Sequence, residues 1–256
     1  MKKRERLAII RQFYPNAITT IDTFNRVIDF VEAKLDIEPS QIMLADSICA
    51  DDVNSIQYPA RAGEFRGPFK MGGLDGFPFT GLTGMAAFAS HVPDGGAVFI
   101  YYGPHIGVSK EGTLGEIYRF GQQNYSSCCG AAKAALGKLT SNAIMAGNVT
   151  DIDYQMNTLE QILLQENDRI RGSAQPLYEA TEVIYEAIDT RIQELVDRTN
   201  FSCNYVLLMG TVLVNSDSDM GSFSATKRFD LINLTTNERY NLTDEYFGLE
   251  TITPTA

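Results

Sequence analysis

Four cysteines and two histidines are the side chains of this 256-residue chain best suited to metal chemistry. Cys49 follows the hydrophobic string QIMLADSI, His105 follows AVFIYYGP, and Cys129 precedes the helix-forming string GAAKAAL. Two thiolates and one imidazole from three separate elements are a typical ligand set of a catalytic zinc ion, which keeps its fourth position open. Cys49, His105 and Cys129 are therefore candidate zinc ligands, and the adjacent Cys128 is the rival of Cys129.

The same residues also have a purely structural interpretation. A cysteine at the end of a buried strand behaves as a small hydrophobic residue, and a lone histidine in a Gly-Pro loop often only satisfies local hydrogen bonds. A closed structural zinc site is not indicated, because it requires four ligands in close pairs and the chain has no CxxC or HxxxH spacing. With two histidines, a three-histidine metal site is excluded.

The overall composition narrows the class of protein. The chain is 44% hydrophobic and 21% charged, as in ordinary globular proteins, and its 21 basic and 32 acidic residues give a net charge of −11. This charge argues against nucleic acid or an anionic membrane as the main partner. The hydrophobic runs are of strand length, so no membrane span is expected.

The cellular compartment is indicated by the N-terminus and the cysteines. The start MKKRERLAII has too short a hydrophobic piece for a signal peptide, and the cysteines show no secreted disulfide pattern. A reduced, cytoplasmic environment is expected, or an organelle if a targeting segment has been removed.

The elements that must position the candidate ligands follow from the hydrophobic periodicity. Continuous hydrophobic strands interleaved with helices predict an α/β fold with a mostly parallel central sheet flanked by helices. We expect a single domain over residues 1–256. Its parts are N-terminal helices at 1–38, a site-bearing core at 39–139, a helical pair at 151–200 and C-terminal strands at 203–256, with a hairpin expected from 205–214 and 226–233.

The core segment is unusual in composition, since fifteen of the 21 glycines lie between Gly63 and Gly130. Glycine at this density favours tight turns over long helices. Within it, strands are predicted at residues 41–48, 97–102 and 114–120. Two serines, Ser126 and Ser127, are expected to act as N-cap residues of the helix that follows them.

Several unusual strings occur in a recognisable order. Cys49-Ala50-Asp51 is similar to the CxD opening of beta-class carbonic anhydrases, and Cys129-Gly130 to the CG that closes their site. The string MGGLDGFPFTGLTGMAAFASHVPDGGAVFIYYGPHIG, followed by GEIYRFGQ and SSCCGAA, resembles the low-CO2-inducible protein B family, also called theta-class carbonic anhydrases. The resemblance is strong over residues 40–140 and looser over the helices after 151.

This resemblance implies a beta-carbonic-anhydrase-like fold with a zinc ion held by Cys49, His105 and Cys129. Cys129 is preferred to Cys128 because it precedes glycine, as in the family's CG. The resemblance further implies reversible hydration of CO2 to bicarbonate and a proton, with zinc-bound hydroxide as the nucleophile. A homodimer is expected from the same resemblance, and the amphipathic segment 18–35 is suitable for packing in it.

An aspartate and an arginine beside the metal are also implied by the resemblance. Asp51 matches the acid, but the position where beta-class enzymes place the arginine is Val53 here. The arginine must therefore come from elsewhere in the chain. Arg119, at the end of the predicted third strand, is preferred, with Arg66 and Arg61 as alternatives.

Several other residues have two alternative roles, and two alternative functions fit the sequence. Phe77, Phe79 and Phe88 form either a CO2 pocket or plain core, His91 is a surface residue or a proton relay, and Cys203 is expected to be buried and inert. The alternative functions are a catalytically silent, zinc-stabilised structural or bicarbonate-sensing protein and, less favoured because adjacent cysteines bridge poorly, a thiol redox protein using Cys128 and Cys129. Phosphate-binding and serine-hydrolase motifs are absent from the sequence.

Overall fold

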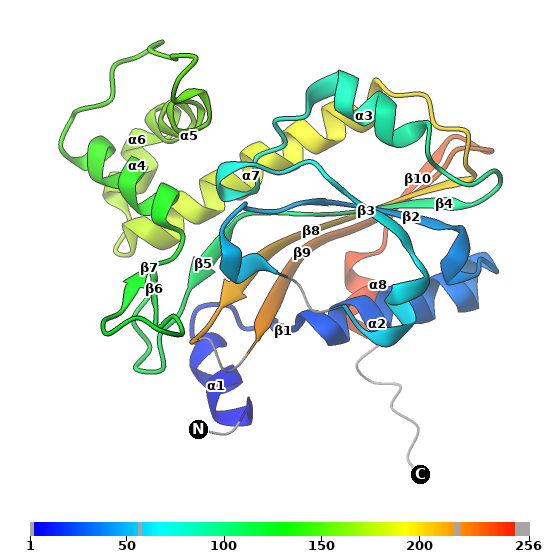
Figure 1. The fold of residues 1–256 in the computed structure, drawn as a ribbon, viewed down its shortest axis with the longest axis horizontal. Helices are drawn as coiled ribbons and strands as arrows, with labels where there is room; N and C mark the ends of the chain where they lie inside the picture. Colours follow the sequence, from blue (N-terminus) through cyan, green and yellow to red (C-terminus); the bar gives the residue numbers. More distant parts are fainter. Residues whose placement is uncertain (1–2, 56–57, 218–220, 249–256) are drawn as a thin grey trace.

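The fold, a computed structural model, is described for residues 3–55, 58–217 and 221–248. Its centre is an eight-stranded sheet with the order β1-β9-β8-β4-β2-β3, in which β10 also pairs with β9 and β5 with β8 (Figure 1). The strands are β1 (Ile18–Thr19), β2 (Ile42–Ser47), β3 (Arg66–Lys70), β4 (Ala97–Tyr102), β5 (His105–Gly107), β8 (Tyr205–Asn215), β9 (Ser222–Asn233) and β10 (Glu238–Asn241).

Strand direction in this sheet agrees with the sequence-based expectation. The pairs β2–β3, β2–β4, β4–β8 and β5–β8 are parallel, whereas β9 runs antiparallel to β8, β1 and β10. The predicted strands at 41–48 and 97–102 are confirmed as β2 and β4. The predicted C-terminal hairpin is confirmed as the antiparallel pair β8–β9.

Helices cover both faces of the sheet. The helices α2 (Thr20–Phe30) and α8 (Thr243–Gly248) lie on one face, and α3 (Gly81–Ala89) and α7 (Pro176–Asp197) on the other (Figure 1). Strand β4 shows why continuous hydrophobic strands are needed: Phe99 and Tyr101 pack in the core on the α2 side, and Ile100 and Tyr102 in the core on the α7 side. Successive strand residues point to opposite faces, so a strand covered on both sides is hydrophobic throughout.

The N-terminal region has the expected helical character. After α1 (Lys3–Ile10), helix α2 begins where the Thr19 hydroxyl accepts a hydrogen bond from the Asp22 amide at 3.1 Å. Phe24, Val27 and Ile28 are fully buried against the chain's own sheet. The apolar face of this amphipathic segment therefore serves the fold of its own chain, and we do not assign it to a dimer interface.

The segment 151–200 contains three helices where a pair was predicted. They are α5 (Tyr154–Gln165), α6 (Asn167–Gly172) and α7, following α4 (Gly130–Thr140). The chain leaves helical geometry at Glu166 and again at Ser173, and Pro176 then begins the long helix α7. The C-terminal segment likewise contains strands followed by α8, and its last residues, 249–256, lie outside the described part. No helix among the described residues has the length and hydrophobicity to cross a membrane.

The predicted third strand at 114–120 is wrong as a strand of the central sheet. The segment holds the short strand β6 (Glu116–Ile117), which pairs with β7 (Ser126–Ser127) in a separate two-stranded sheet, and an isolated bridge from Leu114 to Val108. Gly115 lies within this segment and Gly121 directly follows it, with positive φ angles of 81° and 82°, which interrupts an extended run. The segment therefore forms a loop that projects from the edge of the fold near the start of α4.

Candidate metal centre

Three elements bring the predicted metal ligands together. Cys49 lies two residues after β2, His105 is the first residue of β5, and Cys129 is the N-cap residue of α4. All three residues are buried, and their candidate ligand atoms lie within 4.8 Å of one another. The carboxyl ends of β2 and β4 meet at this edge of the sheet, which is where α/β folds place their ligands.

The turn between β4 and β5 delivers His105 to this position. Strand β4 pairs with the first half of β8, and β5 pairs with its second half. Gly103 and Pro104 join the two strands, so the chain continues along β8 after the turn. Gly103 has φ +149° and lies so close to the Thr211 carbonyl that a Cβ atom would be 1.6 Å from its oxygen. Only glycine fits here, and His105 is consequently held against β8.

The His105 ring is oriented by its surroundings. Its Nδ1 atom lies 2.7 Å from the Asn215 Oδ1 atom, whereas its Nε2 atom is buried and has no hydrogen-bond partner in the described chain. A buried polar nitrogen without a partner is costly, and a metal ion bound to Nε2 would remove that cost. This orphaned nitrogen and the two neighbouring thiols together fit a zinc ion.

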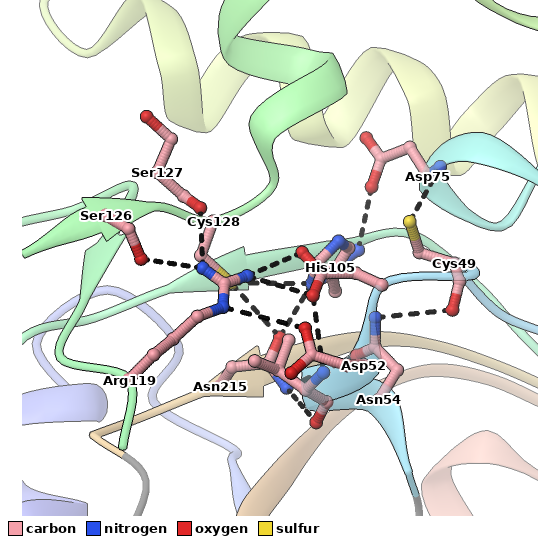
Figure 2. Close-up of polar contacts among 12 residues, drawn as sticks. Cys49, Asp52, Asn54, Asp75, His105, Arg119, Ser126, Ser127, Cys128 and Asn215 are labelled. Atoms are coloured by element: carbon pink, nitrogen blue, oxygen red, sulfur yellow. Dashed lines mark hydrogen bonds and ion pairs between the residues drawn. The ribbon is translucent and has the colours of Figure 1, made fainter. Parts of the chain in front are cut away.

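Cys128 lies beside the Nδ1 atom of the His105 ring. Its Sγ atom is 3.5 Å from His105 Nδ1 and 3.5 Å from Asn215 Oδ1 (Figure 2). It also belongs to a second group of candidate ligand atoms, with Asp51 and His105. Because Asn215 already occupies Nδ1, this geometry favours Cys129 over Cys128 as the partner of Cys49 in holding a metal.

Asp51 and Arg119 form the predicted acid–arginine pair. The Arg119 Nη2 atom donates to Asp51 Oδ1 at 2.9 Å and to Oδ2 at 2.7 Å, while Nη1 donates to the Ser126 hydroxyl at 2.7 Å and the Ser127 carbonyl at 3.2 Å. Figure 2 shows Arg119 reaching towards His105 from the side opposite Cys49. Both side chains of the pair are mostly buried, which strengthens the charge-assisted bonds.

The alternative arginines lie elsewhere. Arg61 is exposed and pairs with Asp29 of α2 and with Glu32, which follows α2, and the exposed Arg66 donates to the Ser40 carbonyl. The two serines have a different role from the predicted one: they form β7 and bind Arg119, and the cap of α4 is Cys129 without a side-chain cap bond.

The two ligand thiols influence each other's ionisation. The hydrogen bond with Cys129 lowers the pKa of Cys49 to about 4 against the effect of burial, and His105 acts in the same direction. The same hydrogen bond, with burial and the charge of Asp75, raises the pKa of Cys129. One thiolate is thus readily available, and a bound divalent cation would displace the second proton.

The pKa of Asp51 is lowered. Burial alone would raise it, but hydrogen bonds with Asp52 and Arg119 outweigh that effect. Asp51 is therefore an ionised carboxylate at neutral pH and can only accept hydrogen bonds.

Asp75 is a site residue that the sequence reasoning missed. Its backbone amide donates to Cys49 Sγ at 3.1 Å, and its Oδ1 atom accepts the His105 amide at 3.1 Å. Burial raises the pKa of this fully buried carboxyl to about 6. The signal in the sequence was weak: an Asp-Gly pair in a glycine-rich loop, where Asp75 has φ +50° and Gly76 has φ +82°.

The other candidates from the sequence are three phenylalanines, His91 and Cys203. Phe88 is core, with ring centroids 5.5 Å from Phe69 and 6.4 Å from Phe201, whereas Phe77 follows directly on the Asp75 turn and packs 5.1 Å from Phe79. His91 is exposed at the end of α3 and is not grouped with the ligands. Cys203 is buried outside the cluster, and burial raises the pKa of its thiol.

Comparisons with known proteins identify the family and the fold of this chain. Residues 18–233 match the family model described as limiting CO2-inducible proteins B/C beta carbonic anhydrases. The crystal structure of PtLCIB4, a homologue of the limiting CO2-inducible protein LCIB, has 26% identity and a TM-score of 0.80 over 92% of this chain and 98% of that one. A histidine-to-alanine mutant of PtLCIB4 has 26% identity and a TM-score of 0.82 over 93% and 99%.

The structure of LCIB itself is similar in fold alone, with 17% identity and a TM-score of 0.67 over 90% of this chain and 95% of that one. Comparison with curated protein sequences gives no significant match. The family match spans the strands from β1 to β9, the three candidate ligands and the Asp51–Arg119 pair. The chain therefore belongs to the limiting CO2-inducible protein B/C family of beta carbonic anhydrases.

Proposed function

We propose that this protein binds zinc through Cys49, His105 and Cys129 and catalyses the reversible hydration of CO2 to bicarbonate and a proton. The observation that carries the proposal is the convergence of three buried ligand atoms within 4.8 Å, beside an aspartate that an arginine holds by two hydrogen bonds. Family membership supports it, since the family is described as beta carbonic anhydrases.

The donor set suits zinc and leaves one position open. When bound, zinc lowers the pKa of a coordinated water to about 7 and supplies hydroxide at neutral pH. Cys49 offers a ready thiolate, and His105 offers Nε2 while its Nδ1 atom remains bound to Asn215.

Asp51 and Arg119 would orient the reacting water. The ionised Asp51 carboxylate accepts a hydrogen bond and so directs an oxygen lone pair of the reacting species towards the carbon of CO2. Both carboxylate oxygens are bound by Arg119, which is itself held by Ser126 and Ser127. This hold keeps Asp51 from moving into the open metal position.

CO2 is uncharged and needs an apolar surface beside the ligands. We assign part of this wall to Phe77, which is buried and follows the turn that contacts Cys49 and His105. The half-buried Phe79 packs against it. Phe88 is left out of this assignment because its ring packs between Phe69 and Phe201.

The test is a stopped-flow CO2 hydration assay on protein of measured zinc content. The wild type should bind one zinc ion per chain and show a metal-dependent rate. Cys49→Ala should lose both, whereas the matched control Cys203→Ala should keep both, because Cys203 is buried away from the cluster. A zinc-loaded wild type without any metal-dependent rate would contradict the catalytic proposal and leave a silent, zinc-stabilised or bicarbonate-sensing protein.

A further inference from the structure

Asn215 ends the longest parallel-paired strand of the sheet, β8, and its buried side chain makes contacts in two directions. Its Oδ1 atom accepts from His105 Nδ1 at 2.7 Å and lies 3.5 Å from Cys128 Sγ. Its Nδ2 atom donates to the Val53 carbonyl at 3.2 Å and to Asn54 Oδ1 at 3.2 Å (Figure 2). All of the amide's polar atoms are therefore engaged at the candidate metal centre.

The strand register explains this placement. His105 pairs with Leu213 and Gly107 with Asn215 in the parallel ladder of β5 and β8. Paired residues share a face of the sheet, and so do residues two apart along a strand. Asn215 thus lies on the same face of the sheet as His105. It is two residues beyond Leu213, the partner of His105, towards the carboxyl end of β8.

The amide can take only one orientation. A carbonyl oxygen such as that of Val53 accepts hydrogen bonds and cannot donate, so the NH2 group of Asn215 must face it. The oxygen then faces the ring of His105, and the Nδ1 atom must carry the ring proton to make the 2.7 Å bond. In a neutral imidazole this leaves the lone pair on Nε2, the nitrogen without a partner among the described residues.

Asn215 also connects the histidine to the turn that follows β2. Asn54, which accepts its amide proton, lies in a short 3-10 helix (Asp52–Asn54) capped by the Asp51 side chain. The side-chain Nδ2 atom of Asn54 in turn lies 3.5 Å from the carbonyl oxygen of Cys49. The contacts therefore run from His105 through Asn215 and Asn54 to Cys49.

We propose that Asn215 is a positioning residue of the metal centre. It holds His105 in the Nδ1–H tautomer, presents Nε2 to the metal, and fixes the ring relative to the turn that carries Cys49 and Asp51. This inference rests on the metal-binding part of the proposed function and is independent of CO2 turnover. Partners of this kind change metal affinity about 10- to 100-fold when removed.

Histidine-selective NMR tests the tautomer directly. The chain has two histidines, so 15N-histidine labelling gives two ring systems, and the exposed His91 serves as the internal reference. Zinc-loaded wild type should show a protected proton on Nδ1 of His105 and a metal-bound shift at Nε2. A proton on Nε2 in zinc-loaded wild type would overturn the proposal without recourse to any variant.

Variants then test the role of Asn215 in metal affinity, measured by competition with a chromophoric chelator. Asn215→Leu should lose the protected Nδ1 proton and bind zinc about 10- to 100-fold more weakly. Asn215→Asp, which keeps the acceptor, should retain the proton signal and bind zinc more tightly than Asn215→Leu. The matched control is Asn204→Leu, at the residue that directly precedes β8, where the exposed side chain donates to the Gly95 carbonyl.

The outcomes separate this inference from the proposed function. If Asn215→Leu keeps the Nδ1 proton and binds zinc as tightly as Asn204→Leu, the positioning role is wrong while CO2 hydration stands. If the NMR and affinity results are as expected but zinc-loaded wild type does not hydrate CO2, the positioning role stands and the catalytic proposal is wrong.

Discussion

At the scale of single residues, the contact of Arg119 Nη2 with both carboxylate oxygens of Asp51 is the feature most directly tied to the proposed reaction. Arg119→Ala and Asp51→Asn should each lower the CO2 hydration rate about 100-fold, because the reacting oxygen loses its orientation. Zinc content should stay near that of the wild type, since neither side chain belongs to the Cys49, His105 and Cys129 group.

The matched control for this prediction is Arg66→Ala, which removes an exposed arginine whose side chain donates to the Ser40 carbonyl, away from the metal centre. It should hydrate CO2 at the wild-type rate. Full activity in Asp51→Asn or Arg119→Ala would sink the assignment of this pair.

Asp46 in β2 provides a second residue-scale prediction, concerning stability. Burial raises the pKa of this carboxyl, and its bonds to Lys70 and Tyr58 offset that effect only in part. The folded chain therefore binds this proton more tightly than the unfolded chain does. Its contribution to stability consequently falls as the pH rises from the ordinary value of 3.8 through the raised folded pKa.

Asp46→Asn removes this titration while keeping the shape of the side chain. Its free energy of unfolding should therefore increase relative to wild type as the pH is raised from about 4 to about 7. Urea unfolding of both proteins across that range measures the difference. A stability difference that stays constant with pH would show that Asp46 titrates normally.

At the scale of elements, the turn between β4 and β5 determines whether His105 reaches the site. Gly103→Ala would place a Cβ atom 1.6 Å from the Thr211 carbonyl oxygen, and backbone cannot move aside as a flexible side chain can. We expect loss of soluble folded protein, or unfolding at least about 3 kcal/mol easier than in wild type.

Gly137→Ala is the control for this substitution. Gly137 lies inside α4, where an added Cβ atom would meet no described residue outside its own helix within 4 Å. Alanine should therefore raise stability by about 0.5–1 kcal/mol through helix propensity. Chemical unfolding of the two variants compares them directly. A Gly103→Ala protein as stable as wild type would show that the turn tolerates a side chain.

At the scale of the whole molecule, the proposed zinc ion joins three elements that are far apart in sequence: the end of β2, the start of β5 and the start of α4. A ligand present at about 1,000 times its Kd adds about 4 kcal/mol to the stability of the folded state. Removing zinc with a chelator should thus lower the Tm by about 10 °C for a chain of this size. Calorimetry measures the change, and Cys49→Ala should show no response to the chelator.

Assembly is also a property of the whole molecule, and we propose a homodimer. The apolar face of 18–35 is already used inside the chain, but Phe120 and Ile152 are 93% and 98% exposed. These side chains would lose their contact with water if they lay in the interface of the dimer. Light scattering should give a mass of twice 28.3 kDa, and a mass of 28.3 kDa would contradict the proposal.

Local patterns in the sequence were sufficient to predict the N-terminal helices, the helical character of 151–200, α4, β2, β4, the β8–β9 pair and the candidate ligands, because hydrophobic periodicity and residue chemistry are properties of short segments. Helix α3 and the division of 151–200 into three helices were not predicted. Local patterns failed at 114–120, where two glycines with positive φ override the alternation of hydrophobic residues. Only the tertiary structure decided that Arg119 binds Asp51 across 68 positions and that Asn215 binds His105 across 110. Such contacts depend on strand order and register, which arise from packing the whole sheet and leave little trace in any local run of residues.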